Sequence, residues 1–161
     1  MKWSEVIENE TLQNLPFKIE LDEWGNVAMS PASNIHGAVQ TAVGFLLSQS
    51  KGEGVVISGC SLRTSKGVKV ADVVWISAAF FSRNGMETPY EVAPELCTKI
   101  VSPSNSDAEM AQKRELYLAK GAKEVWTCSL EGHVTFFNHR SEMDASDLFP
   151  SFPSVVELPG V

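Results

Sequence analysis

The sequence predicts one α/β domain built from layers of helices and strands. The 161 residues are enough for one hydrophobic core, and 43% of them are apolar. Helical and strand periodicities follow one another along the chain in the order α-β-β-α-β-β-β-α-β-β. Because the sequence contains no internal repeat and no low-complexity linker, we expect residues 1–161 to form a single domain.

The first predicted elements are a short helix and a hairpin. Residues 4–12 have amphipathic helical spacing, and Pro16 stops any continuation of that helix. Apolar and charged residues alternate over residues 17–22, which predicts a strand with Phe17, Ile19 and Leu21 on one face. A turn signal follows, and residues 27–29 are the predicted hairpin partner.

A long helix with one apolar stripe is predicted next. Ser33 or Asn34 can accept hydrogen bonds from its first amides, and the helix extends to about Gln49. Gly52 and Gly54 then break the chain before a second series of strands. The helix has apolar residues at intervals of three and four, namely Ile35, Val39, Ala42, Val43, Leu46 and Leu47.

Two central strands each contain a charged residue among apolar neighbours. Residues 68–76 are rich in β-branched side chains, and Asp72 shares a face with three of the apolar ones. A second predicted strand, residues 96–101, places Lys99 on the same face as Cys97 and Val101. A charged group in such surroundings is costly unless it is paired, hydrogen-bonded or bound to an ion.

The remaining elements are a loop, a helix, two strands and a tail. Residues 82–94 form a predicted polar loop. The helix opens at Ser106, with Glu109 at capping-box spacing, and closes at Gly121. Strands follow at 124–128 and 133–137. Residues 140–161 contain three prolines and little periodicity, which predicts an extended arm on the surface or on a partner.

Charge, cysteines and hydropathy indicate which partners, which cysteine chemistry and which location the sequence favours. The net charge is −7, yet residues 63–123 carry nine basic and seven acidic side chains, which suit either phosphate contacts or a solvated helix face. The three cysteines are far apart and suit reduced core thiols. No apolar stretch approaches the roughly 20 residues that span a bilayer, and the first residues are acidic. We therefore expect a cytoplasmic protein with no membrane segment.

Several motifs in order along the chain resemble the Uma family of restriction-endonuclease-like proteins, within the PD-(D/E)xK nuclease superfamily. They are residues 15–20 (LPFKIE), 29–33 (MSPAS) with His36-Gly37, 70–73 (VADV), 93–95 (APE), 100–105 (IVSPSN), Lys113 with Tyr117, Gly121-Ala122, and 124–126 (EVW). The resemblance implies a restriction-endonuclease-like fold, a mixed sheet flanked by helices. It also implies cleavage of DNA with a divalent metal, Mg²⁺ or Mn²⁺, and a homodimer.

The resemblance also implies roles for particular residues. Asp72 and Glu20 match the metal-binding acids, and His36 and Lys113 fall at positions where the family commonly keeps polar residues. Lys99 is the fifth residue assigned to the catalytic site. The basic segment that follows is the candidate DNA contact, with Lys113, Arg114, Lys120 and Lys123. Taken without the resemblance, Glu20 equally suits a solvated strand face and His36 a helix cap.

One position departs from the family pattern in a way that bears on activity. Lys99 stands where the pattern implies the second catalytic acid, and a cation there opposes Mg²⁺. We therefore expect the Lys99 ammonium to pair with Asp72 in the place of a metal. Two functions remain open: a DNA endonuclease, impaired by Lys99, or an inactive nuclease fold that acts as a nucleic-acid-binding or homo-oligomeric module.

Overall fold

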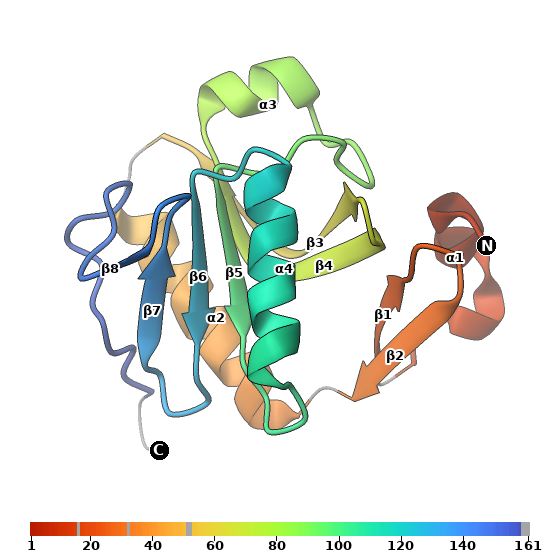
Figure 1. Ribbon diagram of the computed structural model, residues 1–161, viewed down its shortest axis with the longest axis horizontal. Helices are drawn as coiled ribbons and strands as arrows, with labels where there is room; N and C mark the ends of the chain where they lie inside the picture. Colours follow the sequence, from red (N-terminus) through yellow and green to blue (C-terminus); the bar gives the residue numbers. More distant parts are fainter. Residues whose placement is uncertain (16, 32, 51–52, 159–161) are drawn as a thin grey trace.

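A six-stranded sheet forms the centre of the protein in the computed structural model, which describes residues 1–15, 17–31, 33–50 and 53–158 (Figure 1). In sheet order the strands are β3 (Val55–Thr64), β4 (Gly67–Ile76), β5 (Leu96–Ile100), β6 (Glu124–Cys128), β7 (Val134–Phe137) and β8 (Glu142–Met143). Strands β5 and β6 are parallel, and the other neighbouring pairs are antiparallel. The predicted mixed sheet is therefore confirmed. Pro16, Ala32, Lys51, Gly52 and residues 159–161 lie outside the described residues.

The sheet has one long helix on each face, α2 (Asn34–Ser50) behind and α4 (Asp107–Ala119) in front (Figure 1). The Ser33 hydroxyl accepts a hydrogen bond from the His36 amide, and Ser106 caps α4 in the same way through the Glu109 amide. Helix α4 connects β5 to β6, as parallel neighbouring strands require.

Strand alternation divides the apolar residues into two cores. Val73 and Trp75 pack with α2 on one face, in a core that also contains Trp126. Val74 and Cys97 pack with Tyr117 of α4 on the other face. Asp72 and Lys99 are next along the α4 face, as the alternation predicts. The three cysteines are free and buried, as expected.

A separate unit lies at one end of the sheet. Strands β1 (Phe17–Leu21) and β2 (Val27–Pro31) form the predicted hairpin, and α1 (Trp3–Glu8) with the 3₁₀ turn η1 (Glu10–Leu12) lies against it (Figure 1). The face of Ile19 and Leu21 packs in a small core with α1. The opposite face, which contains Lys18 and Glu20, is thereby directed to β4 and β5.

Helix α3 (Ala78–Asn84) is an element that the sequence pattern does not predict. The Ser77 hydroxyl accepts a hydrogen bond from the Phe80 amide and starts the helix. The helix has only seven residues and buries Phe80 alone, so no helical stripe marks it in the sequence. The predicted polar loop begins inside this helix.

The C-terminal segment packs into the core, whereas the sequence predicted an extended arm on the surface or on a partner. Strand β8 pairs with β7, and Val155 forms a bridge with His133. Phe149, Phe152 and Val156 are buried in the α2-side core. Among the described residues, no helix is long and apolar enough to cross a membrane.

Candidate site around Asp72

The site lies where β4 and β5 separate. The paired residues of these strands run from Trp75–Leu96 to Val73–Thr98. Asp72 lies directly beyond the last pair. The Asp72 Oδ2 atom bridges the opening and accepts a hydrogen bond of 2.7 Å from the Ile100 amide. The opening therefore contains a side-chain carboxylate where regular strands would exchange backbone hydrogen bonds.

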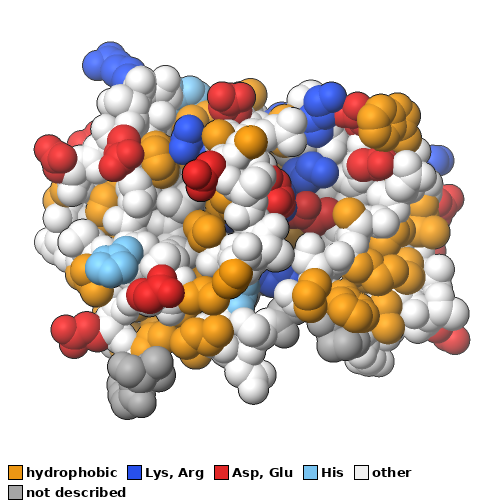
Figure 2. Space-filling view, turned by 60° about the horizontal axis from the view of Figure 1, so that its bottom comes forward, with side chains coloured by type: hydrophobic (Ala, Val, Ile, Leu, Met, Phe, Trp, Pro, Cys, Tyr) orange, Lys and Arg blue, Asp and Glu red, His pale blue; other side chains and the backbone are white. Residues whose placement is uncertain are grey.

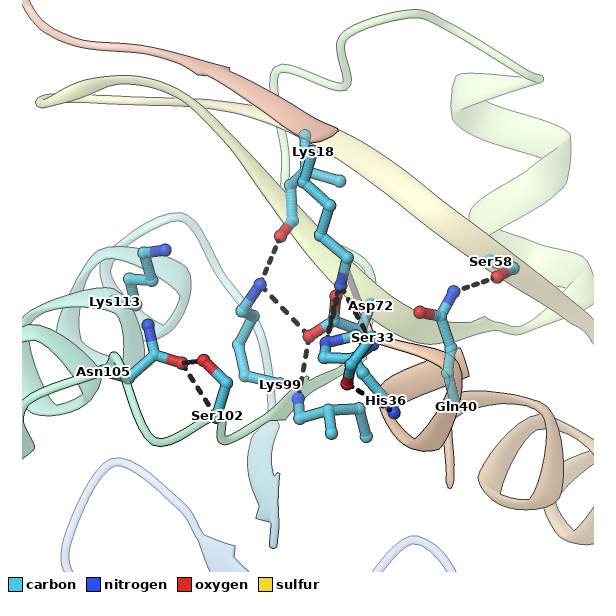
Figure 3. Close-up of polar contacts among 12 residues, drawn as sticks. Lys18, Ser33, His36, Gln40, Ser58, Asp72, Lys99, Ser102, Asn105 and Lys113 are labelled. Atoms are coloured by element: carbon cyan, nitrogen blue, oxygen red, sulfur yellow. Dashed lines mark hydrogen bonds and ion pairs between the residues drawn. The ribbon is translucent and has the colours of Figure 1, made fainter. Parts of the chain in front are cut away.

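Two lysines and a histidine surround this carboxylate, whose side chain is fully buried (Figure 3). Lys18 of β1 donates to Oδ1, and Lys99 of β5 lies 3.1 Å from Oδ2. The Lys99 ammonium also donates to the Val70 carbonyl at 3.0 Å. The expected ion pair between Lys99 and Asp72 is therefore present, and Lys18 adds a second cation.

His36 comes from the first turn of α2 and completes the cluster. Its Nε2 atom lies 2.7 Å from the Lys18 ammonium and 3.6 Å from Asp72 Oδ1. The Nδ1 atom lies 3.4 Å from the same ammonium, which has only donors, so the nearer ring nitrogen, Nε2, accepts from Lys18. The imidazole therefore helps to hold Lys18 in place.

Burial and charge shift the ionisation of all three groups. Burial alone would raise the pKa of Asp72, but Lys99, Lys18 and the Ile100 amide outweigh it and hold that pKa below its usual value. Burial lowers the pKa of His36, and Lys18 and Lys99 lower it further against the opposing effect of Asp72. Burial likewise lowers the pKa of Lys18, despite Asp72. At neutral pH the cluster contains an ionised Asp72 and a neutral His36.

Glu20 and Lys113 form a second ion pair beside the first. The Glu20 carboxylate accepts a hydrogen bond of 3.0 Å from the Val70 amide and lies 3.2 Å from the Lys113 ammonium. The Glu109 carboxylate lies 3.2 Å from the same Lys113 ammonium. Burial would lower the pKa of Lys113, but Glu20 and Glu109 outweigh it and raise that pKa. Glu20 thus supports the β4 edge and is not a solvated strand residue.

A small cavity of about 40 Å³ lies between the two ion pairs. Side chains from five parts of the chain line it, among them Lys18, His36, Lys99, Asn105 and Lys113. The Asn105 amide donates to Glu109, and its carbonyl oxygen accepts from the Ser102 hydroxyl, so the loop after β5 is fixed at the cavity (Figure 3). The structure thus brings together all five residues assigned to the catalytic site.

The four predicted DNA contacts do not gather at this cavity. Lys113 lines it, but Arg114 lies over the Phe137 ring at 4.1 Å, and Lys123 pairs with Glu95 at 3.2 Å. The Lys120 carbonyl accepts a hydrogen bond from the Ala93 amide. On the face seen in Figure 2, basic and acidic side chains are interspersed, and the described residues there form no continuous basic area.

The residues around Asp72 do not fit the metal that the resemblance implies. Both Asp72 oxygens already accept from cationic groups, and Glu20 contacts Val70 and Lys113 instead of sharing an ion with Asp72. Glu95, which directly precedes β5, accepts a hydrogen bond from the Ser77 amide and pairs with Lys123. Within the described ranges, no three His, Cys, Asp or Glu side chains are grouped to hold a metal.

Sequence reasoning missed Lys18 as a member of the site. It lies 54 positions from Asp72, and only the docking of the hairpin brings the two together. The signal that could have found it is the spacing of Lys18 and Glu20, which places both on the same face of β1.

Comparison with known proteins gives a family match and a fold match. Residues 7–148 match the model of the Uma2 family, described as "Putative restriction endonuclease". A crystal structure of a "putative nuclease belonging to DUF820" from Anabaena variabilis superposes with a TM-score of 0.73 at 15% identity. The alignment covers 97% of this chain and 94% of that chain. A search of curated proteins found no match.

Proposed function

Because the chain belongs to the Uma2 family of restriction-endonuclease-like proteins, we propose that it binds DNA at the Asp72 site and has lost metal-dependent hydrolysis. Of the two functions that the sequence left open, the geometry favours the second. One observation carries this choice: the buried Asp72 carboxylate is shared by the ammonium groups of Lys18 and Lys99.

The electrostatic cost of adding a metal to this cluster is large. Two unit charges 4 Å apart interact by about 4 kcal/mol at an effective dielectric constant near 20, so a divalent ion and one ammonium repel by about 8 kcal/mol. A millimolar affinity corresponds to only about 4 kcal/mol. The Asp72 carboxylate attracts the ion by a similar amount, so the first ammonium cancels that attraction and the second makes the sum unfavourable for Mg²⁺.

DNA is the proposed ligand because of the family and the chemistry of the cavity lining. Lys18, Lys99 and Lys113 line the cavity, and Ser102 and Asn105 add neutral polar side chains. Such groups are those that contact phosphate oxygens in protein–DNA complexes. The neighbouring acids neutralise much of this charge, so we expect modest affinity with a shallow salt dependence.

Cleavage assays on supercoiled and single-stranded DNA with Mg²⁺ or Mn²⁺ test the loss of hydrolysis. The native protein should not cut. The variant Lys18→Met with Lys99→Glu should bind Mn²⁺ in a calorimetric titration, because it removes two cations and restores a second acid beside Asp72. Cleavage by the native protein that Asp72→Asn abolishes would show a working metal site and overturn the proposal.

Fluorescence anisotropy with labelled duplex DNA tests the binding. Lys113→Gln should weaken affinity about three- to tenfold and reduce the salt slope by about one. Lys66→Gln is the matched control, because Lys66 also pairs with a glutamate, at 2.6 Å from Glu23, but does not line the cavity. If the native protein shows no affinity for DNA, or both variants weaken it equally, DNA binding at this site is wrong.

A further inference from the structure

The cavity beside Asp72 has space for only a small group. Its volume is about 40 Å³. A water molecule needs roughly 10–15 Å³ of such space, so the cavity holds about three groups of the size of an oxygen atom. A base or a deoxyribose is too large to enter, and a DNA ligand can insert nothing bigger than the oxygens of one phosphate. The cavity therefore selects among phosphates by the oxygens that each of them presents.

The three lysines that line the cavity each retain one N–H donor. An ammonium group has three donors, and on each of these lysines two of them are used by acceptors in the described part of the chain. The acceptors are Glu20 and Glu109 for Lys113, Asp72 and His36 for Lys18, and Asp72 and the Val70 carbonyl for Lys99 (Figure 3). Three donors therefore remain for a ligand, one from each lysine.

We propose that the cavity takes the terminal phosphate of a DNA strand, a monoester, in preference to the diester phosphates within the strand. This inference rests on the proposed binding of DNA at the Asp72 site. A terminal phosphate presents three free oxygens, which match the three remaining donors and fill the space for three oxygen-sized groups. An internal phosphate presents only two free oxygens, because its other two carry sugars.

Charge favours the same end group. The cavity lining contains the three lysines and, among the described residues, one carboxylate, Glu20. Asp72 and Glu109 pair with these lysines from outside the lining, which keeps the affinity modest. A monoester carries a charge of about −1.5 to −2 at pH 7, whereas a diester carries about −1. Because hydrogen bonds from ammonium to phosphate are charge-assisted, the group with the larger charge and the third acceptor should bind more tightly.

Fluorescence anisotropy with short DNA duplexes, labelled at an internal base in EDTA, tests the end group on the native protein. Duplexes with a 5′-phosphate or a 3′-phosphate are compared with the same duplex ending in hydroxyl groups. Both ends are tested because both can carry the same monoester. At least one phosphorylated duplex should bind about tenfold more tightly than the hydroxyl-ended duplex, as one added charge-assisted hydrogen bond predicts.

The matched control is the same terminal phosphate blocked as its methyl ester. This group keeps the end of the strand but has the two free oxygens and the single charge of a diester, so it should bind like the hydroxyl end. Lys113→Met should remove most of the preference, because methionine has a similar length but no donor. Lys66→Met should keep the preference, because Lys66 does not line the cavity.

The possible failures are distinguishable. Equal affinity for the phosphate and hydroxyl ends, or for the phosphate and its methyl ester, would overturn this inference and leave DNA binding intact. If no duplex bound, the proposed function would fail and this inference with it. A deoxynucleoside monophosphate, used as competitor, identifies the source of the monoester. Binding of this nucleotide as tight as that of the phosphorylated duplex would assign the cavity to free nucleotides and overturn the assignment to DNA ends.

Discussion

At the scale of single residues, the Asp72 side chain links three parts of the chain through its contacts. Its carboxylate connects Lys18 of the hairpin, Lys99 of β5 and the Ile100 amide, and His36 of α2 supports Lys18. A complete group of buried opposite charges adds little to the free energy of unfolding. Removing one partner lowers that free energy strongly, because a buried charge is then left without its counter-charge.

Asp72→Asn should therefore destabilise the protein by about 3 kcal/mol, because it leaves two ammonium groups without a counter-charge. Lys99→Met should cost less, since Lys18 still pairs with Asp72. Urea denaturation of the two variants and the native protein measures the difference. If Asp72→Asn costs no more than Lys99→Met, the carboxylate does not have the central role described.

His36 should make stability depend on pH near neutrality. Burial and the nearby Lys18 and Lys99 lower its pKa, so the unfolded chain, with a histidine pKa of about 6.5, binds a proton that the folded protein resists. Stability should therefore fall as the pH decreases below about 7. The lowered pKa of Asp72 causes a further loss only below about pH 4.

Denaturation midpoints between pH 5 and 8 measure this effect. His36→Gln should flatten the dependence in this range. A slope that persists in His36→Gln would mean that another group is responsible.

At the scale of elements, the site depends on a distortion in the β3–β4 hairpin. Ser58 pairs with Val73 and Cys60 with Ala71, but Gly59 and Asp72 between them form no regular pair. Gly59 has φ of +68°, a left-handed conformation that side chains other than glycine rarely adopt. The strand is distorted directly opposite the residue at which β4 leaves β5.

Gly59→Ala should cost about 1 kcal/mol, because alanine in a left-handed conformation is strained. Gly37→Ala is the matched comparison. A Cβ atom at either glycine meets nothing within 4 Å, so only the backbone conformation differs. In the helix, alanine should be neutral or stabilising. Equal urea midpoints for the two variants would contradict the assigned role of Gly59.

At the scale of the whole molecule, Glu124 fastens the C-terminal segment to the sheet. Its buried carboxylate accepts hydrogen bonds from the Trp126 indole, the Ser146 hydroxyl and the amides of Asp147 and Leu148, all at 2.7 or 2.8 Å. This arrangement directs the chain so that Phe149 and Phe152 reach Trp126.

Glu124→Gln should destabilise the protein by about 1–3 kcal/mol, because an amide can accept at only one of its two ends and leaves buried donors unpaired. Glu131→Gln, in an exposed turn, is the control. Hydrogen exchange should increase over residues 146–156 in Glu124→Gln alone. Unchanged exchange there would show that the apolar contacts hold the segment without the carboxylate.

The sequence predicted most regular elements and much of the site, and the exceptions have physical reasons. Alternation placed Asp72 and Lys99 on the same face of adjacent strands because that pattern is local. The contact of Lys18 with Asp72 depends on how the hairpin docks, which no local pattern contains. The C-terminal segment lacks periodicity because isolated side chains such as Phe149 and Phe152 anchor it.

The position of these anchors affects how the protein is made. A ribosome adds about 5–20 residues per second, so the 26 positions between Trp126 and Phe152 take about 1–5 s to synthesise. Phe136 follows Trp126 within ten residues, but for most of that interval the α2-side core lacks Phe149 and Phe152, which also pack against Trp126. The α2-side core therefore cannot close until Phe149 and Phe152 have been added to the chain. Slower translation of residues 127–152 should increase aggregation more than slower translation of the first 50 residues.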